Sequence, residues 1–188
     1  AVVGGAGYIG SFTSHVLKDR GYEIVIIDNL SSGNKEAVNN SRLIEVDIVN
    51  RKDLLDGLFQ KEKFDAVIHF AALIQVKESM ENPGLYFKNN ILGSLNLIEA
   101  AAKNKIKAFV FSSTAAVYGN PQVGPIPESH SISPTNVYGE TKAMIEKILS
   151  WYWNIFRFPS VSIRYFNAAG AALDGSMGED HPNETHLI

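Results

Sequence analysis

The sequence contains no cysteine, which excludes disulfides and thiol catalysis and favours a cytoplasmic protein. Long basic runs are also missing, and 17 Lys and Arg stand against 20 Asp and Glu, for a net charge of −3. Nucleic acid and membranes are therefore not expected as partners. No apolar run approaches the roughly 20 residues that a membrane-spanning helix needs. With 188 residues, 45% of them hydrophobic, the chain predicts a globular fold with one sizeable core.

Short apolar runs alternate with longer helical patterns along the chain. Most of these runs are nearly continuous, which is typical of strands covered on both faces in a parallel sheet. The alternation predicts an α/β fold, namely a doubly wound, Rossmann-type parallel sheet. The expected strands are 1–3, 23–28, 42–47, 65–70, 107–112 and 161–166, and the expected helices are 9–19, 51–60, 83–102 and 137–154.

Two segments interrupt this alternation. Residues 119–136 contain four prolines and little periodicity, which predicts a loop, and a loop of that length is usually functional or disordered. Residues 168–188 are rich in Gly, Asp, Glu and His. We therefore expect a nucleotide-binding domain at 1–167 and, at 168–188, the truncated beginning of a smaller C-terminal substrate-binding region that is largely missing from this chain.

The glycine-rich segment VVGGAGYIGS follows the first expected strand and precedes a helix. It contains both a GxGxxG spacing and a wider GxxGxxG spacing through Gly4, Gly7 and Gly10. Glycines permit a tight turn and let the backbone approach a pyrophosphate, which then sits at the helix N-terminus. A turn without a ligand is the alternative, but the strand and helix on either side favour a dinucleotide site.

Asp28 ends the second expected strand, 18 residues after Gly10. This is near the spacing of about 20 residues at which a carboxylate binds the adenosine ribose hydroxyls. Asn29 and Leu30 follow, and no adjacent arginine is present to accept a 2′-phosphate. The segment therefore favours NAD over NADP. The alternative for Asp28 is a solvated carboxylate at a strand end.

Tyr138 and Lys142 stand four residues apart in the segment YGETK. Residues at i and i+4 share one face of a helix, so an ammonium beside the phenol is expected to lower the tyrosine pKa from about 10 toward neutrality. Tyr138 would then be a proton-transfer group. The spacing is common in exposed helix pairs. Its position after a nucleotide-binding half, and 24 residues after Thr114, favours catalysis.

Several motifs occur in one order over essentially the whole chain, namely GGAGYIG, DNLSSG, VDI, HFAA, NN, FSSTAAVYG, YGETK and RYFNAAGA. Together they resemble the extended short-chain dehydrogenase/reductase family. The resemblance implies an NAD-dependent isomerase that acts on a UDP-sugar and interconverts UDP-glucose and UDP-galactose in galactose metabolism. Hydride would pass from sugar C4 to NAD and return to the other face of the 4-keto sugar. A homodimer through the helices around 83–102 and 137–154 is also implied.

The same resemblance assigns residues to roles. Tyr138 would be the base and acid at the sugar 4-hydroxyl, Lys142 would hold the nicotinamide ribose, and Thr114 would hydrogen-bond the same sugar oxygen. The residues that it implies at the cofactor are Gly4, Gly7, Tyr8, Ile9, Gly10, Asp28, Asn29, Leu30, Ser31, Ser32, Gly33, Asp47, Ile48, Phe70, Ala71, Ala72, Asn89, Ser112, Tyr138, Lys142 and Phe166. Those that it implies at the nucleotide-sugar are Thr114, Tyr138, Asn167, Thr185, His186 and Leu187.

Two departures within the motifs bear on the reaction and the cofactor. Related nucleotide-sugar dehydratases carry acidic residues just after the Thr114 position, whereas this chain has Ala115 and Ala116, which favours epimerisation over elimination of water. Bacterial family members often place a lysine four residues after the Phe70 position, and Ile74 stands there in this chain. One contact to a cofactor phosphate is therefore in question.

Alternative interpretations stay open for the function and for several residues. The substrate could be a UDP-N-acetylhexosamine or a UDP-hexuronic acid, and a non-enzymatic NAD-binding sensor is a further alternative. His181 and His186 lie near acidic residues, but their spacing matches no zinc pattern, so no metal is expected. His69 is expected to satisfy a backbone group beside the cofactor. Trp151 and Trp153 cannot share a helix face, and either could be core or interface.

Overall fold

The computed structural model describes residues 1–38, 40–122 and 124–180. A six-stranded sheet organises this part of the chain, with the order β3-β2-β1-β4-β5-β6 and parallel pairing throughout. This is the doubly wound order, so the predicted Rossmann-type α/β fold is confirmed. The strands are β1 (Val2–Val3), β2 (Val25–Asp28), β3 (Arg42–Glu45), β4 (Ala66–His69), β5 (Ala108–Ser112) and β6 (Ser160–Ile163).

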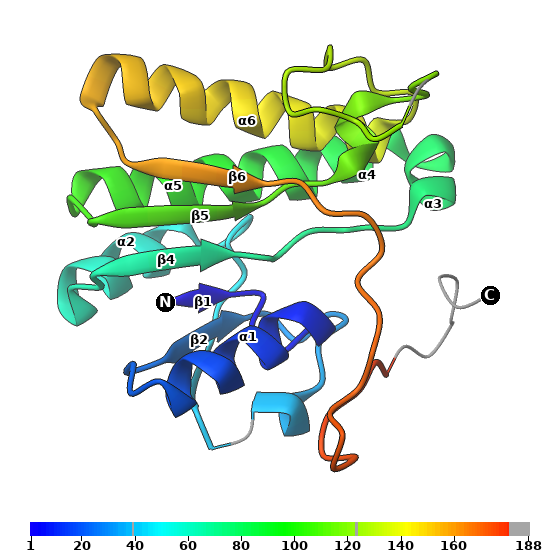
Figure 1. Ribbon diagram of the computed structural model, residues 1–188. Coiled ribbons are helices and arrows are strands. Elements are labelled where there is room, and N and C mark those ends of the chain that lie inside the picture. Colours follow the sequence, from blue (N-terminus) through cyan, green and yellow to red (C-terminus); the bar gives the residue numbers. More distant parts are fainter. Residues whose placement is uncertain (39, 123, 181–188) are drawn as a thin grey trace.

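Helices fall between the strands, as the alternation predicts. In Figure 1, α2, α5 and α6 lie together on one side of the sheet, and α1 lies on the other. The α-helices are α1 (Tyr8–Asp19), α2 (Lys52–Glu62), α3 (Val76–Glu81), α4 (Pro83–Tyr86), α5 (Gly93–Lys103) and α6 (Val137–Phe156). Shorter elements are the 3₁₀ turns η1 (Lys35–Val38) and η3 (Ala115–Tyr118) and the π-helical segment η2 (Phe87–Leu92).

The main core lies between the sheet and the layer of α2, α5 and α6. Phe59 of α2, Leu97 of α5 and Leu149 of α6 pack there against Phe109 and Phe111 of β5, and all five are buried. Fully burying side chains of this kind stabilises the fold by about 1.5–3 kcal/mol each. This layer holds α5 and α6 firmly against the strands, and α6 carries Tyr138 and Lys142.

The opposite face of the sheet is covered unevenly. A small cluster of Ala6, Ile26 and Val38 packs beneath α1 and η1 at the β1–β2 side. On β6, by contrast, Val161 and Ile163 are 53% and 48% exposed. Among the described α-helices, α1 is the one that lies on this face of the sheet. In the described part of the chain, no α-helix covers the β4–β6 half of this face.

The sixth strand is shorter than the sequence predicts. It ends at Ile163 instead of Phe166, because Arg164 turns toward Glu146 of α6, with 2.9 Å between Nε and Oε1. The carbonyl of Tyr165 then accepts a hydrogen bond from the backbone N–H of Ala115 at 2.9 Å. Residues 164–167 are therefore carried over the carboxyl edge of the sheet.

The helix predicted at 83–102 is really three consecutive segments, α4, η2 and α5. A separate helix, α3, precedes Pro83 and was not predicted. It has six residues and no side-chain cap, so it leaves little periodic signal. Residues 119–136 form an irregular loop where they are described, as predicted.

Residues 168–180 follow the carboxyl edge of the sheet back toward the N-terminal half (Figure 1). The hydroxyl of Tyr8 donates to the carbonyl of Gly170 at 2.6 Å, and Asn34 Nδ2 donates to Asp180 at 3.2 Å. Trp151 and Trp153 are both about half exposed, so a core role is wrong for either one. No helix in the described ranges is long and apolar enough to cross a bilayer.

Candidate functional site

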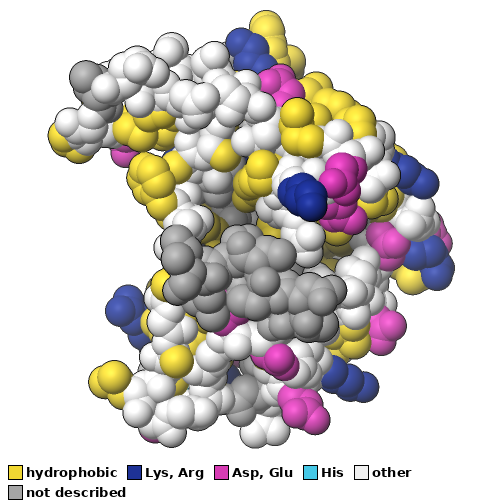
Figure 2. Space-filling model, turned by 90° about the vertical axis from the view of Figure 1, so that its right-hand side faces the viewer, with side chains coloured by type: hydrophobic (Ala, Val, Ile, Leu, Met, Phe, Trp, Pro, Cys, Tyr) yellow, Lys and Arg dark blue, Asp and Glu magenta, His cyan; other side chains and the backbone are white. Residues whose placement is uncertain are grey.

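A cleft of about 460 Å³ runs along the carboxyl edge of the sheet. Figure 2 looks onto this edge and shows the surface hollowed there, with apolar side chains along the hollow. Ligands of open α/β sheets bind in this position, outside the carboxyl ends of the strands. The volume is within the roughly 300–1,000 Å³ of typical small-molecule sites.

The cleft collects nearly all the predicted site residues. Leu30 is the exception among those described, because its backbone φ is +56° and its side chain packs against the Ala6 cluster. Thr185, His186 and Leu187 lie outside the described residues. The predicted residues that line the cleft are Gly4, Gly7, Tyr8, Ile9, Gly10, Asp28, Asn29, Ser31, Ser32, Gly33, Asp47, Ile48, Phe70, Ala71, Ala72, Asn89, Ser112, Thr114, Tyr138, Lys142, Phe166 and Asn167.

The glycine turn brings the start of α1 to the cleft. Gly4 has a φ of +80°, and a Cβ at Gly10 would lie 2.2 Å from the carbonyl oxygen of Gly4. Only glycine at these positions lets the turn fold back on the helix. Gly7 immediately precedes α1, and the first backbone N–H groups of a helix have no partner within it. These donors and the helix dipole make a site for a phosphate group.

Asp28 connects the end of β2 to the glycine turn. Its Oδ2 accepts the backbone N–H of Ala6 at 3.0 Å, and its Oδ1 accepts that of Leu30 at 2.9 Å. The side chain is buried and borders the cleft, so the alternative of a solvated strand-end carboxylate is wrong. Each carboxylate oxygen keeps a second lone pair, with which it can accept a ligand hydroxyl.

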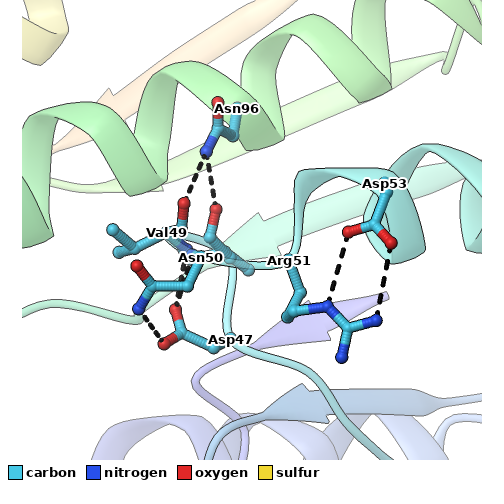
Figure 3. Close-up of polar contacts among 7 residues, drawn as sticks. Asp47, Val49, Asn50, Arg51, Asp53 and Asn96 are labelled. Carbon is cyan, nitrogen blue, oxygen red and sulfur yellow. Dashed lines mark hydrogen bonds and ion pairs between the residues drawn. The ribbon is translucent and has the colours of Figure 1, made fainter.

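A second turn beyond β3 borders the cleft through Asp47, Ile48 and Val49, and Figure 3 shows the polar contacts that hold it. Asp47 accepts hydrogen bonds from the backbone of Val49 at 2.8 Å and from the side chain of Asn50 at 2.7 Å. Asn96 of α5 donates to the carbonyls of Ile48 and Val49 at 2.8 and 3.3 Å. The turn that presents Asp47 and Ile48 is therefore held from the core.

Thr114 and Tyr138 meet where η3 and the first turn of α6 pack together. Asn136 caps α6 by accepting the N–H of Gly139 at 2.8 Å. A Cβ at Gly139 would lie 2.9 Å from the carbonyl oxygen of Ala116, so glycine allows this close approach. Both side chains line the cleft there, and the Thr114 hydroxyl acts to lower the pKa of the Tyr138 phenol.

The electrostatics of Tyr138 and Lys142 differ from the prediction. Burial raises the pKa of Tyr138 to about 12, although the hydrogen bond from Thr114 opposes the shift. Lys142 points its ammonium at the carbonyl of Ser112, at 2.8 Å, and lies 5.8 Å from the centre of the Tyr138 ring. The expectation of a lowered tyrosine pKa is therefore wrong for this geometry. Burial lowers the pKa of Lys142 to about 7, because little water reaches the amine.

His69 is buried behind the cleft and does not line it. Its Nε2 bonds the hydroxyl of Ser94 at 2.8 Å, and its Nδ1 has no hydrogen-bond partner. The expected backbone partner is therefore wrong, and a side chain of α5 takes that place. Burial lowers the pKa of His69 to about 3, so the ring is neutral.

Several cleft residues were not predicted from the sequence. Tyr165 directs its hydroxyl to Ser112, and Tyr86 donates to Glu78 at 2.7 Å. Neither residue could be placed from the sequence. Tyr165 follows the unexpectedly early end of β6, and Glu78 belongs to α3, which was not predicted. Leu73 also lines the cleft. Ala115 and Ala116, which were expected beside Thr114, line it as well.

Cations and metal ligands are scarce around the cleft. Lys142 is the one Lys or Arg among its described lining residues, so none of these replaces the lysine that is absent at Ile74. The described ranges contain no group of three or more His, Asp and Glu that could hold a metal ion. His181 and His186 lie outside those ranges. Phosphate binding would therefore depend on the start of α1.

Fold and site together define a doubly wound dinucleotide-binding protein with a tyrosine–lysine pair, the short-chain dehydrogenase/reductase class. The profile of the NAD dependent epimerase/dehydratase family matches residues 1–188, and the chain belongs to this family. It is 47% identical over 189 residues to a UDP-glucose 4-epimerase from Lacticaseibacillus casei, a match that covers all of this chain and 57% of the relative.

Solved structures give the same likeness. A UDP-glucose 4-epimerase from Brucella ovis in complex with NAD is 43% identical, with a TM-score of 0.96 over 99% of this chain and 57% of that one. A UDP-Glc/GlcNAc 4-epimerase from Campylobacter jejuni is 40% identical, with a TM-score of 0.85 over 97% and 57%. The chain thus spans somewhat more than half the length of these relatives.

Proposed function

We propose that the whole protein is an isomerase that interconverts UDP-glucose and UDP-galactose by transient oxidation at C4 of the sugar, with NAD as a recycled cofactor. A cytoplasmic role in galactose metabolism belongs to this proposal. One observation carries it above the others. Thr114, Tyr138 and Lys142 converge on the carboxyl edge of a dinucleotide-binding sheet, in a chain 47% identical to a UDP-glucose 4-epimerase.

The cleft residues fit NAD. The turn of Gly4, Gly7 and Gly10 would hold the pyrophosphate at the start of α1, where a Cβ at Gly10 would clash with the backbone. Asp28 would accept the adenosine ribose hydroxyls, and the Asp47 turn would border the adenine. The Asp28 carboxylate would repel a 2′-phosphate, which favours NAD over NADP. When bound, NAD supplies a hydride acceptor and a positive charge on the nicotinamide ring.

Proton transfer falls to Tyr138. The phenol would take the proton of the 4-hydroxyl as C4 loses hydride, and would return it when C4 is reduced again. Burial raises its pKa to about 12 even though Thr114 opposes the shift, so the phenolate needs further compensation. The positive charge that bound NAD brings would supply it. Lys142 would bind the nicotinamide ribose.

The residues beside Thr114 support epimerisation over dehydration. Ala115 and Ala116 line the cleft and carry no group that can give or take a proton. Elimination of water needs an acid and a base close to the sugar. With neither at these two positions, return of the hydride to C4 is the favoured outcome.

Two further parts of the proposal concern assembly and substrate. We propose a homodimer through the helices around 83–102 and 137–154, where Leu92, Met144 and Trp151 are exposed apolar side chains. Residues 168–188 would begin the substrate-binding region, with Asn167 and the segment 185–187 near the nucleotide-sugar.

The Campylobacter relative, a UDP-Glc/GlcNAc 4-epimerase, makes an N-acetylated sugar the second candidate substrate. The test is a coupled assay of NAD-loaded full-length protein on UDP-galactose, UDP-N-acetylgalactosamine and UDP-glucuronic acid. We expect kcat/KM for UDP-galactose to exceed the others by about tenfold or more. Comparable rates on the first two would indicate the broader specificity. Tight NAD binding with no conversion of any UDP-sugar would contradict the proposal and favour the sensor.

A further inference from the structure

Glu78 places a carboxylate at the Tyr138 end of the cleft. It belongs to α3 and lines the cleft, and the hydroxyl of its neighbour Ser79 accepts the backbone N–H of Tyr138 at 3.2 Å. Oε2 of Glu78 accepts the hydroxyl of Tyr86 at 2.7 Å, and Tyr86 is a fully buried side chain that borders the same cleft. Glu78 and Tyr86 therefore form a hydrogen-bonded pair beside the reacting tyrosine.

This pair holds its negative charge in one place and leaves one oxygen open. Burial, followed by the hydrogen bond and the charge of Glu78, raises the pKa of Tyr86, so the phenol stays protonated and donates. Among the described residues, Tyr86 is the one partner of the Glu78 carboxylate. The Glu78 oxygen Oε1 is not among the buried side-chain atoms that lack a partner in this part of the chain. Oε1 is therefore an accessible acceptor on a side chain that borders the cleft.

The charges around Glu78 do not compensate it. Lys142 is the one Lys or Arg among the described lining residues, and its ammonium points at a backbone carbonyl. The other described carboxylates of the lining lie toward the glycine turn and β3, and they are Asp28, Asp47 and Glu179. The Tyr138 end of the cleft thus carries one carboxylate and, within the described lining, a single cation that is already engaged.

We propose that Glu78, oriented by Tyr86, determines which sugars the cleft accepts, admitting a neutral hexose and excluding a hexuronic acid. The inference rests on the proposed function, because it concerns the sugar whose C4 lies at Tyr138. C6 is joined to C5, the neighbour of C4, so a carboxylate at C6 enters the same end of the cleft whichever face of the ring is presented. Two carboxylates there repel each other, whereas a neutral C6 hydroxyl offers a donor to Oε1.

The experiment compares UDP-galactose with UDP-galacturonic acid, which differ only at C6, on NAD-loaded full-length protein. Glu78→Gln keeps the shape and an acceptor for Tyr86 but removes the charge. We expect it to lower the preference for UDP-galactose in kcat/KM about 10- to 100-fold, because placing like charges together in a binding site is costly. The inhibition constant of UDP-galacturonic acid against UDP-galactose conversion should fall by a similar factor, and this is measurable even if the acidic sugar is not converted.

Two controls separate the charge from the side chain and from stability. Glu78→Asp keeps the charge and should keep most of the preference. Glu81→Gln removes a charge from an exposed site on the same helix, outside the described lining of the cleft, and should behave as wild type. A Glu78→Gln variant with wild-type preference and inhibition, or wild type that binds and converts both sugars equally well, would overturn the inference while the proposed function stands. Wild-type protein that converts no UDP-sugar would overturn both.

Discussion

Tyr138→Phe is expected to lower kcat for UDP-galactose about 10²- to 10⁴-fold while NAD stays bound, because the variant loses the proton-transfer group alone. The backbone of Tyr138 is held by Ser79 and Thr141, and neither bond involves the phenol oxygen. The hydroxyl itself is in contact with Thr114. The fold around the cleft should therefore persist. Steady-state kinetics and the nucleotide content of the purified variant check this.

Tyr118→Phe is the matched control for this prediction. Its hydroxyl accepts from Arg164 at 2.8 Å, and it lies in a separate buried cluster outside the cleft. Removing that hydroxyl should cost about a kcal/mol of stability and little of kcat. A Tyr138→Phe enzyme that retained more than about a tenth of wild-type kcat would be inconsistent with general acid–base catalysis by this residue.

Lys142→Met is expected to stabilise the fold near neutral pH while it removes activity. Burial lowers the pKa of Lys142 from 10.5 to about 7, so the unfolded chain binds more protons than the native one between those values. Stability therefore rises with pH across this window, by roughly 2–3 kcal/mol between pH 7 and pH 9. Methionine carries no charge, so the variant should lack this slope.

Urea unfolding at pH 7 and pH 9, without added nucleotide, measures this effect. We expect Lys142→Met to be more stable than wild type at pH 7. The gain should shrink or reverse at pH 9, where the lost hydrogen bond to the Ser112 carbonyl remains as a cost of about 1–3 kcal/mol. Lys107→Met, at an exposed ion pair with Asp65, is the control and should change stability little. Equal pH slopes for wild type and Lys142→Met would contradict the account.

The sheet and its edge could be predicted because parallel strands leave a clear signal. The four inner strands β1, β2, β4 and β5 hold the buried strand residues, so they appear as apolar runs, and their carboxyl ends meet at the ligand edge. The positions of Asp28, Thr114 and Tyr138 along the sequence were therefore enough to predict that all three line one site. The end of β6 could not be predicted from the sequence. The strand ends just before Arg164, which pairs with Glu146 of α6, and these two residues are far apart in the sequence.

The chemistry of the tyrosine–lysine pair was less predictable than its position. An i, i+4 spacing places both side chains on one face of a helix, but it does not show how much water reaches them or where the ammonium points. The carbonyl of Ser112 takes the ammonium, and burial dominates both pKa values.

The fate of a deuterium label at C4 tests the central claim most directly. Full-length protein with bound NAD would be given UDP-galactose deuterated at C4, and the products followed by NMR and mass spectrometry. The account predicts UDP-glucose that keeps the deuterium at C4, with no label in water and no net formation of NADH. Loss of the label to solvent, accumulation of NADH with a 4-keto sugar, or a 4-keto-6-deoxy product would contradict it.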